Sequence, residues 1–145
     1  MTDQTLKKSS LFLLELIIVL LFFSFCTAVC INLFVKAKIA STQSYDLNNS
    51  VLAAQNAVEC FKATDADAKE IASLLGGTQN NNTVSITYDK NWNVTKKSDY
   101  IYKLTFTINP VQENIISADL TIVKDTTTLY SLSAVTFVDT TAGGD

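Results

Sequence analysis

One carboxylate interrupts the apolar stretch near the amino terminus. Residues 11–35 contain only four polar side chains, Glu15, Ser24, Thr27 and Asn32, and of these Glu15 alone is charged. A carboxylate at mid-bilayer costs about 2.5–3.5 kcal/mol and usually marks a function, so Glu15 needs a partner or a short route to the interface. Alternatively, Glu15 lies close enough to the start of the run to reach the interface or to be protonated, and has no role.

The element that positions Glu15 is a membrane span. The apolar run covers residues 11–35, and as a helix these 25 residues extend roughly 37 Å, enough to cross a hydrocarbon core of about 30 Å. Lys7 and Lys8 precede the run, and Lys36 and Lys38 follow it. Two positive charges on each side do not fix the orientation of the span.

Two kinds of signal peptide compete with a permanent span. A secretory signal could be cut after Cys26-Thr27-Ala28, but Glu15 would then lie inside its apolar core and the apolar run would continue past the cut. A lipoprotein signal needs a small residue before the modified cysteine, whereas Cys26 and Cys30 follow Phe25 and Val29. We therefore expect the span to be retained.

The residues around Glu15 resemble the amino terminus of type IV prepilins and pseudopilins. A short polar leader with two lysines ends in Ser9-Ser10, and Leu-Phe-Leu-Leu-Glu-Leu then opens the helix. In that family a leader is removed just before the apolar helix, and a glutamate occupies the fifth mature position. The resemblance covers residues 7–35. This chain departs from the family in having Ser10 and Leu11 where Gly and Phe are most common, and in lacking the proline that bends the helix.

The resemblance implies a processing step and an assembly role. Prepilin peptidase would remove the leader, residues 1–10, by cutting between Ser10 and Leu11, and would methylate the new amine of Leu11. The leader lysines would stay in the cytoplasm and the carboxy-terminal domain would lie outside it. Glu15 would neutralise the terminal amine of a neighbouring subunit, so the partners are other pilin or pseudopilin subunits and the membrane. The assembled product would be a bacterial cell-surface pilus, or a secretion or competence filament.

An amphipathic helix is expected to continue the span over residues 36–63. No proline or glycine occurs between Leu11 and Gly76, so one helix can run from the membrane to about Ala63. Apolar residues recur at spacings of 4, 3, 4 and 3, which draws one stripe along a helix: Leu47, Val51, Ala54, Val58 and Phe61. We expect this stripe to pack on a sheet.

Residues 64–145 are expected to add a short helix and an antiparallel sheet. Asp67 and Glu70 have the spacing of a capping box, and Gly76-Gly77 ends the short helix. Asp65 and Asp67 lack the ligand spacing and turn glycine of a calcium loop, so capping explains them better.

Alternation of apolar and polar residues predicts four strands: residues 83–88, 100–108, 115–123 and 129–138. In the last strand the apolar residues change face, which a bulge near Ala134 would explain. The short connections between them, one containing Pro110, favour an antiparallel meander. The predicted fold is α+β: a long membrane-spanning helix whose distal half packs on a four-stranded antiparallel sheet. Periodicity alone therefore leads to the architecture that pilins have.

Composition excludes most catalytic chemistry. The chain has no histidine, and all eleven of its basic residues are lysines, so a His-ligated metal, an imidazole base or an arginine clamp is impossible. No nucleophile with a base and no phosphate-binding glycine loop is present, and we expect no enzyme activity, cofactor or metal. A net charge of -3 argues against direct nucleic-acid binding.

A few residues could serve other roles. We interpret Cys26, Cys30 and Cys60 as small apolar fillers rather than redox or acylation sites. Trp92, in a polar loop with Lys90, Lys96 and Lys97, either closes the end of the sheet or forms a partner-binding patch. The alternative function is a single-span signal-anchor protein whose exported domain binds a ligand without assembling.

Overall fold

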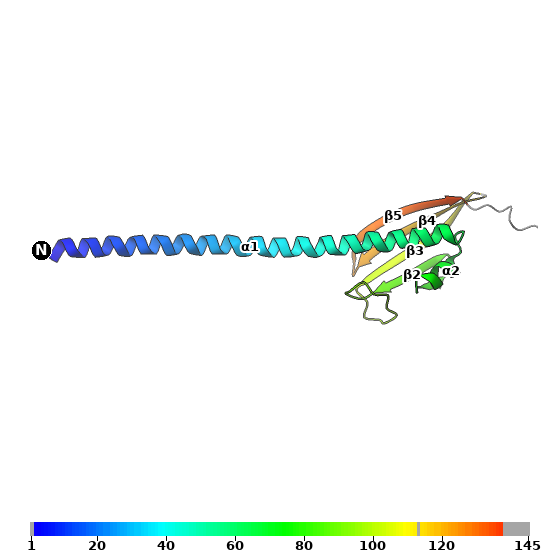
Figure 1. Ribbon diagram of the computed structural model, residues 1–145, viewed down its shortest axis with the longest axis horizontal. Helices are drawn as coiled ribbons and strands as arrows, with labels where there is room; N and C mark the ends of the chain where they lie inside the picture. The colour runs from blue at the N-terminus through cyan, green and yellow to red at the C-terminus, as the bar shows by residue number, and fades with distance from the viewer. Residues whose placement is uncertain (1, 113, 138–145) are drawn as a thin grey trace, which may run out of the picture. The chain divides into compact units, whose positions relative to one another are not determined.

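The computed structural model of the chain describes residues 2–112 and 114–137. The chain divides into two compact units, Met1–Gln43 and Ser44–Asp145, and each is described by itself. The first unit is helical. The second holds the last part of the same helix, a short second helix and a five-stranded sheet (Figure 1).

Helix α1 spans Thr2–Ala63. Its end at Ala63 confirms the predicted end of the long helix. The chain contains no proline or glycine that would break the helix over this length. The helix begins well before the apolar run and passes without interruption through Ser10 and Leu11, where the leader was expected to end.

The apolar residues of the first unit are exposed over the described part of the chain. From Leu11 to Val35 every side chain is exposed except that of Cys26, which is half-buried. The helix is long and apolar enough to cross a membrane, and its apolar window is not buried anywhere in the protein. This is the pattern of a single-pass membrane protein, because water is a poor solvent for so much exposed apolar surface.

The second unit contains an antiparallel meander. Its strands are adjacent in chain order, and each pairs with the next: β1 Thr78–Asn80, β2 Thr83–Tyr88, β3 Tyr102–Gln112, β4 Ile115–Lys124 and β5 Thr127–Phe137. The predicted meander is confirmed, but the predicted number of four strands is wrong. The additional strand β1 has three polar, exposed residues, so it carries no apolar alternation to reveal it.

The bounds of β3 also differ from the prediction. The strand begins at Tyr102, and Tyr100 lies outside it with 42% of its surface exposed. Pro110 lies inside β3, opposite Ile116, and not in the connection. The pairing of β2 with β3 ends at Thr107, so beyond this residue one side of β3 is a free edge. Proline is tolerated at such an edge because no hydrogen bond between strands requires its missing N–H group.

Strand β5 has its bulge at Leu129 and not near Ala134. Ala134 lies in regular register opposite Ala118. The register shifts where Ile122 pairs with Tyr130 and Val123 with Thr128, which leaves Leu129 as the extra residue. The predicted position was wrong by five residues, because the outward-facing Val135 and Phe137 are apolar although they are exposed.

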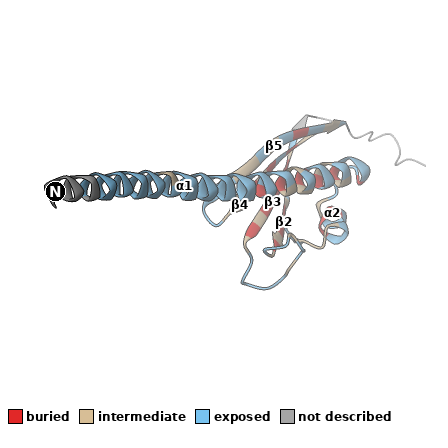
Figure 2. Ribbon diagram, turned by 60° about the vertical axis from the view of Figure 1, so that its left-hand side comes forward, coloured by how far each residue is buried: buried red, intermediate tan, exposed pale blue. Residues whose placement is uncertain are grey.

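The distal part of α1 covers the apolar face of the sheet with a different stripe from the predicted one. Its buried residues recur at spacings of 4, 4, 3 and 4, and the first two are polar: Asp46, Ser50, Ala54, Ala57 and Phe61. Figure 2 shows this buried stripe on the distal part of α1. The prediction was right for Ala54 and Phe61, which are buried, and the half-buried Val58 also packs against the core. It was wrong for Leu47, which is 48% exposed, and Val51 is only half-buried. The small Ala54 and Ala57 let the helix approach the sheet closely, whereas a stripe centred on Val51 would hold it away.

The hydrophobic core lies between this helix and the inner face of β2, β3 and β4. Alternate strand residues supply most of it, including Val84, Ile86, Leu104, Phe106, Leu120 and Ile122. The ring of Phe61 packs edge-on against that of Phe106, with 5.4 Å between centroids. Core aromatic pairs of this kind add about 0.5–1.5 kcal/mol beyond the area they bury.

Helix α2, Ala68–Leu74, confirms the predicted short helix and its cap. The Asp67 carboxylate accepts hydrogen bonds from the backbone N–H groups of Lys69 and Glu70, at 2.8 and 3.4 Å. Gly77, just after the helix, packs against β2: a Cβ there would lie 2.8 Å from both the Ser85 carbonyl oxygen and the Ile86 Cγ1. Only glycine fits this close approach.

Candidate functional site

Glu15 is the one charged side chain of the span, and it has no partner within the described residues. Two of the other polar side chains bond to their own helix: the Thr27 hydroxyl donates to the Phe23 carbonyl at 2.9 Å, and the Asn32 amide donates to the Ala28 carbonyl at 3.0 Å. Glu15 is exposed, and no described residue forms a hydrogen bond or ion pair with it.

Ser10, Leu11 and Glu15 lie within two turns of α1. Ser10 and Leu11 have exposed side chains, and Leu11 and Glu15 are four residues apart, which places them on one face of the helix. The peptide bond between Ser10 and Leu11 is part of the helix. Cleavage at this bond and methylation of Leu11 remain predictions.

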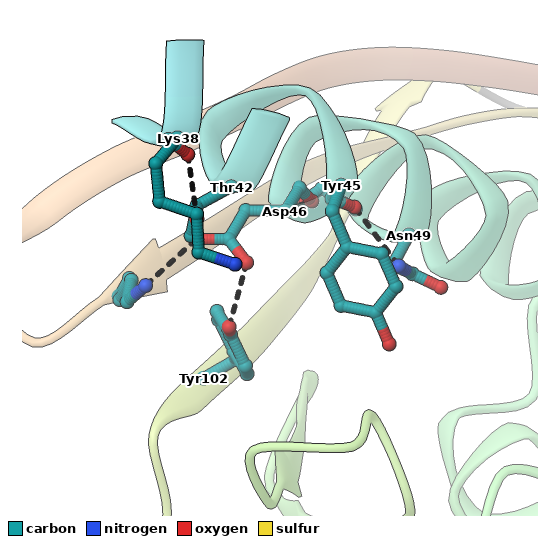
Figure 3. Close-up of polar contacts among 8 residues, drawn as sticks. Lys38, Thr42, Tyr45, Asp46, Asn49 and Tyr102 are labelled. Carbon is teal, nitrogen blue, oxygen red and sulfur yellow. Dashed lines mark hydrogen bonds and ion pairs between the residues drawn. The ribbon is translucent and has the colours of Figure 1, made fainter. Parts of the chain in front are cut away.

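A buried ion pair in the second unit was missed by the sequence reasoning. Asp46 on α1 accepts a hydrogen bond from the Tyr102 hydroxyl of β3, at 2.7 Å, and pairs with the Lys124 ammonium of β4, at 2.7 Å. Figure 3 shows the Tyr102 hydroxyl directed at Asp46. The Asp46 side chain is only 6% exposed and that of Lys124 is 34% exposed. We call these three residues the Asp46 cluster.

The Asp46 cluster favours the protonated forms of Lys124 and Tyr102. The hydrogen bond to Asp46 raises the pKa of Lys124 above its usual value, although burial opposes this. Burial, and then the hydrogen bond to Asp46, raises the pKa of Tyr102. Both shifts keep the protons on Lys124 and Tyr102 at neutral pH, so the buried carboxylate has two charge-assisted hydrogen bonds.

An aromatic stack extends the Asp46 cluster into the loop between β2 and β3, residues 89–101. The Trp92 ring stacks on Tyr102 with 4.1 Å between centroids and 20° between planes, and the Lys124 ammonium lies 5.3 Å from the Tyr102 centroid. Trp92 thus packs on the end of the sheet, which is the first of its two predicted roles. Its φ of 62° is unusual for a bulky residue, and its indole N–H is buried without a partner among the described residues.

The turn that carries Trp92 is held by Asp89. Its carboxylate accepts backbone hydrogen bonds from Asn91, at 2.8 Å, and from Asn93, at 3.0 Å. These bonds hold the pKa of Asp89 below its usual range, the bond from Asn93 contributing most. Such Asx bonding satisfies the backbone of a tight turn and fixes where the indole is placed.

The Asp46 cluster fastens α1 to the sheet and does not suggest catalysis. It offers no nucleophile beside a base, and its charges neutralise each other. A signal in the sequence could have located it. Asp46 and Ser50 continue the stripe of Ala54, Ala57 and Phe61 at helical spacing, and Lys124 falls on the inward phase of β4. Opposite charges on the buried face of a helix and on the buried face of a strand predict that the two side chains form an ion pair.

The other residues singled out from the sequence do not converge on a site. Lys90, Lys96 and Lys97 are exposed in the loop between β2 and β3. The three cysteines are free. Burial and the neighbouring charge of Glu59 raise the pKa of the Cys60 thiol, which lowers its reactivity.

No known family model, curated protein or solved structure matches the chain. A function therefore has to be argued from its own residues. The two features that require an explanation are the carboxylate of Glu15, which has no partner among the described residues of an exposed apolar helix, and the domain that follows this helix.

Proposed function

We propose that the chain is a minor pilin or pseudopilin: a structural subunit that is processed by prepilin peptidase and polymerised through its amino-terminal helix. The filament would be a type IV pilus or the related filament of a secretion or competence system. The subunit would wait in the cytoplasmic membrane as a single-pass protein, with the carboxy-terminal domain outside the cytoplasm. It has no catalytic role in this proposal.

The observation that carries the proposal is the unpaired carboxylate of Glu15. It lies five residues after Ser10, at the distance from the expected cut that the prepilin resemblance requires. Thr27 and Asn32 satisfy their polar groups within α1, whereas Glu15 finds no partner among the described residues. A group that is costly in the isolated subunit and paired in a polymer favours assembly.

Electrostatics indicates what the partner is. Cleavage before Leu11 would create a terminal amine at the start of the apolar helix. At 4 Å and an effective dielectric constant of 20, an ammonium and a carboxylate attract each other by about 4 kcal/mol. This attraction is of the same order as the cost of about 2.5–3.5 kcal/mol for one charged side chain in the bilayer centre, so pairing between neighbouring subunits would offset the cost of Glu15.

The exposed surface of the span supports the same proposal. A filament of packed helices buries apolar side chains from Leu11 to Val35 against other copies once they leave the membrane. The order of the elements also agrees with the expectation from the resemblance, because one long helix is followed by an antiparallel sheet. A signal-anchor protein with the same domain would keep this helix in lipid and would have no use for Glu15.

The proposal is tested by replacing Glu15 and measuring assembly in the organism that makes the protein. Glu15→Val should remove the subunit from sheared filaments while leaving its amount in the membrane unchanged. Thr27→Val is the matched control, because its hydroxyl is already bonded to Phe23 of the same helix and the change should leave assembly intact. Equal recovery of both variants in filaments would refute the role of Glu15. Absence of the unmodified protein from every filament would favour the signal-anchor alternative.

A further inference from the structure

A groove opens along the free edge of β2, where two different segments pair with the strand. Strand β1 pairs with the first half of β2, from Thr83 to Ser85. Beyond it, Val94 forms a bridge with Tyr88, and the Thr95 N–H donates to the Thr87 carbonyl at 2.8 Å. The space at the junction is a groove of about 320 Å³, within the range of small-ligand sites.

The lining of the groove includes two glycines. Gly76 adopts a φ of 67°, and a Cβ there would lie 3.4 Å from Val94. A Cβ on Gly77 would lie 2.8 Å from the Ser85 carbonyl oxygen and from the Ile86 Cγ1, so this glycine packs tightly against β2. The two glycines therefore bring the main chain close to β2 and to Val94 at this side of the groove.

Hydroxyl groups line the rest of the groove. Five serine and threonine residues contribute to it: Thr78, Ser85, Thr87, Thr95 and Ser98. Two of the hydroxyls are held in place, since Thr87 donates to the Thr95 carbonyl and Thr78 donates to the Ser85 carbonyl. Each oxygen keeps lone-pair capacity for a ligand hydroxyl, because a hydroxyl both donates and accepts.

Positive charge and one aromatic ring complete the lining. Lys96, Lys97 and Tyr100 are exposed and take part in it. Among the described residues the only ion pair is that of Asp46 with Lys124, so neither Lys96 nor Lys97 is neutralised. The acidic side chains of this loop, Asp89 and Asp99, line a neighbouring hollow together with Lys90 and Lys97, so Lys97 takes part in both linings.

We propose that this groove binds an acidic carbohydrate. The hydroxyls match those of a sugar, the Tyr100 ring offers a flat apolar surface to the C–H face of a pyranose, and the two ammonium groups pair with a carboxylate or phosphate. A nucleic acid fits less well, because the chain carries a net charge of -3 and the groove offers one aromatic ring, too few for successive base stacking. The site lies in the second unit and depends neither on processing nor on assembly.

The test uses the full chain in detergent micelles and an oligogalacturonate as the probe. Trp92 is the only tryptophan and lies in the same loop as the two lysines, so its fluorescence can report binding, with calorimetry as a second readout. Lys96→Gln with Lys97→Gln should weaken binding about tenfold or more, because two charge-assisted contacts are lost. Tyr100→Ala should weaken it as well. Lys62→Gln with Lys69→Gln is the control with the same change of charge, outside the groove, and should leave binding unchanged.

Further probes distinguish a carboxylate from a phosphate as the charged group of the ligand, and some of their outcomes would overturn the proposal. If a glycerol-phosphate oligomer competes better than oligogalacturonate, the natural ligand carries phosphate groups. If oligogalacturonate competes better, the ligand carries uronate carboxylates. Either outcome supports the site. The proposal is overturned if oligogalacturonate does not bind, if neutral dextran binds equally well, if oligothymidylate binds as tightly, or if the Lys96/Lys97 variant binds like the control.

Discussion

The Asp46 cluster makes a prediction about which partner of the ion pair is more costly to remove. The carboxylate of Asp46 is 6% exposed, whereas Lys124 is 34% exposed and can turn into water. Removing the lysine therefore leaves a buried charge, while removing the carboxylate leaves a charge that solvent can reach. The less exposed member of the pair depends more on its partner.

The magnitudes follow from this difference. Lys124→Met keeps the aliphatic stem and leaves the Asp46 carboxylate with the Tyr102 hydroxyl bond, so we expect a loss of about 3 kcal/mol in the free energy of unfolding. Asp46→Asn keeps an oxygen that accepts from Tyr102, and solvent screens the released Lys124, so the expected loss is about 1 kcal/mol. The double variant should lose about 2 kcal/mol, which gives a coupling energy of about 2 kcal/mol.

The assay is urea unfolding of the full chain in detergent, followed by the fluorescence of Trp92. This single tryptophan stacks on Tyr102 with 4.1 Å between centroids, so its signal reports directly on the end of the sheet that holds the Asp46 cluster. The reasoning is wrong if Asp46→Asn costs more than Lys124→Met, or if the coupling energy is below about 0.5 kcal/mol.

Two further predictions concern the same domain. Burial raises the pKa of Tyr88 to about 12, so above about pH 10 the unfolded chain loses this proton first. The contribution of Tyr88 to the free energy of unfolding should be fully present below pH 10 and should fall by roughly 2–3 kcal/mol by pH 12, as measured by urea unfolding across this range. Tyr88→Phe should remove this fall; the raised pKa values of Tyr102 and Lys124 act in the same direction and add a further fall that the variant keeps. Gly77→Ala should cost about 2 kcal/mol in thermal or urea unfolding, because its Cβ meets backbone at 2.8 Å, and an unchanged midpoint would show that β2 yields instead.

Local signals predicted the parts of the fold that local chemistry determines. The absence of proline and glycine predicted that α1 extends to about Ala63, and the capping residue Asp67 predicted where α2 begins. Alternation of apolar residues located the four longer strands, and the short connections gave their antiparallel order. Each of these features depends on residues close together in the chain.

Features that depend on tertiary contact were not predicted. The strand β1 is polar and owes its place to pairing with β2, as Thr78 opposite Ser85 illustrates. The buried stripe of α1 begins with Asp46, which is acceptable only because Tyr102 and Lys124 arrive from strands far along the chain. A stripe drawn from apolar types alone therefore included the exposed Leu47 and missed the polar start of the buried face.

The evidence for the candidate assembly site comes from the sequence and not from tertiary contacts. Ser10, Leu11 and Glu15 were selected by their order at the start of the apolar run. To this the structure adds that the three residues lie on one uninterrupted helix, and that Glu15 lacks a partner among the described residues. The partner that the proposal requires belongs to a neighbouring pilin or pseudopilin subunit.

The measurement that bears most directly on the proposal is the identity of the amino-terminal residue of the protein recovered from its native membrane, by mass spectrometry of the terminal peptide. We predict a peptide that begins at Leu11 with a methylated amine. A mature protein that still begins at Met1, in cells with an active prepilin peptidase, would contradict the account.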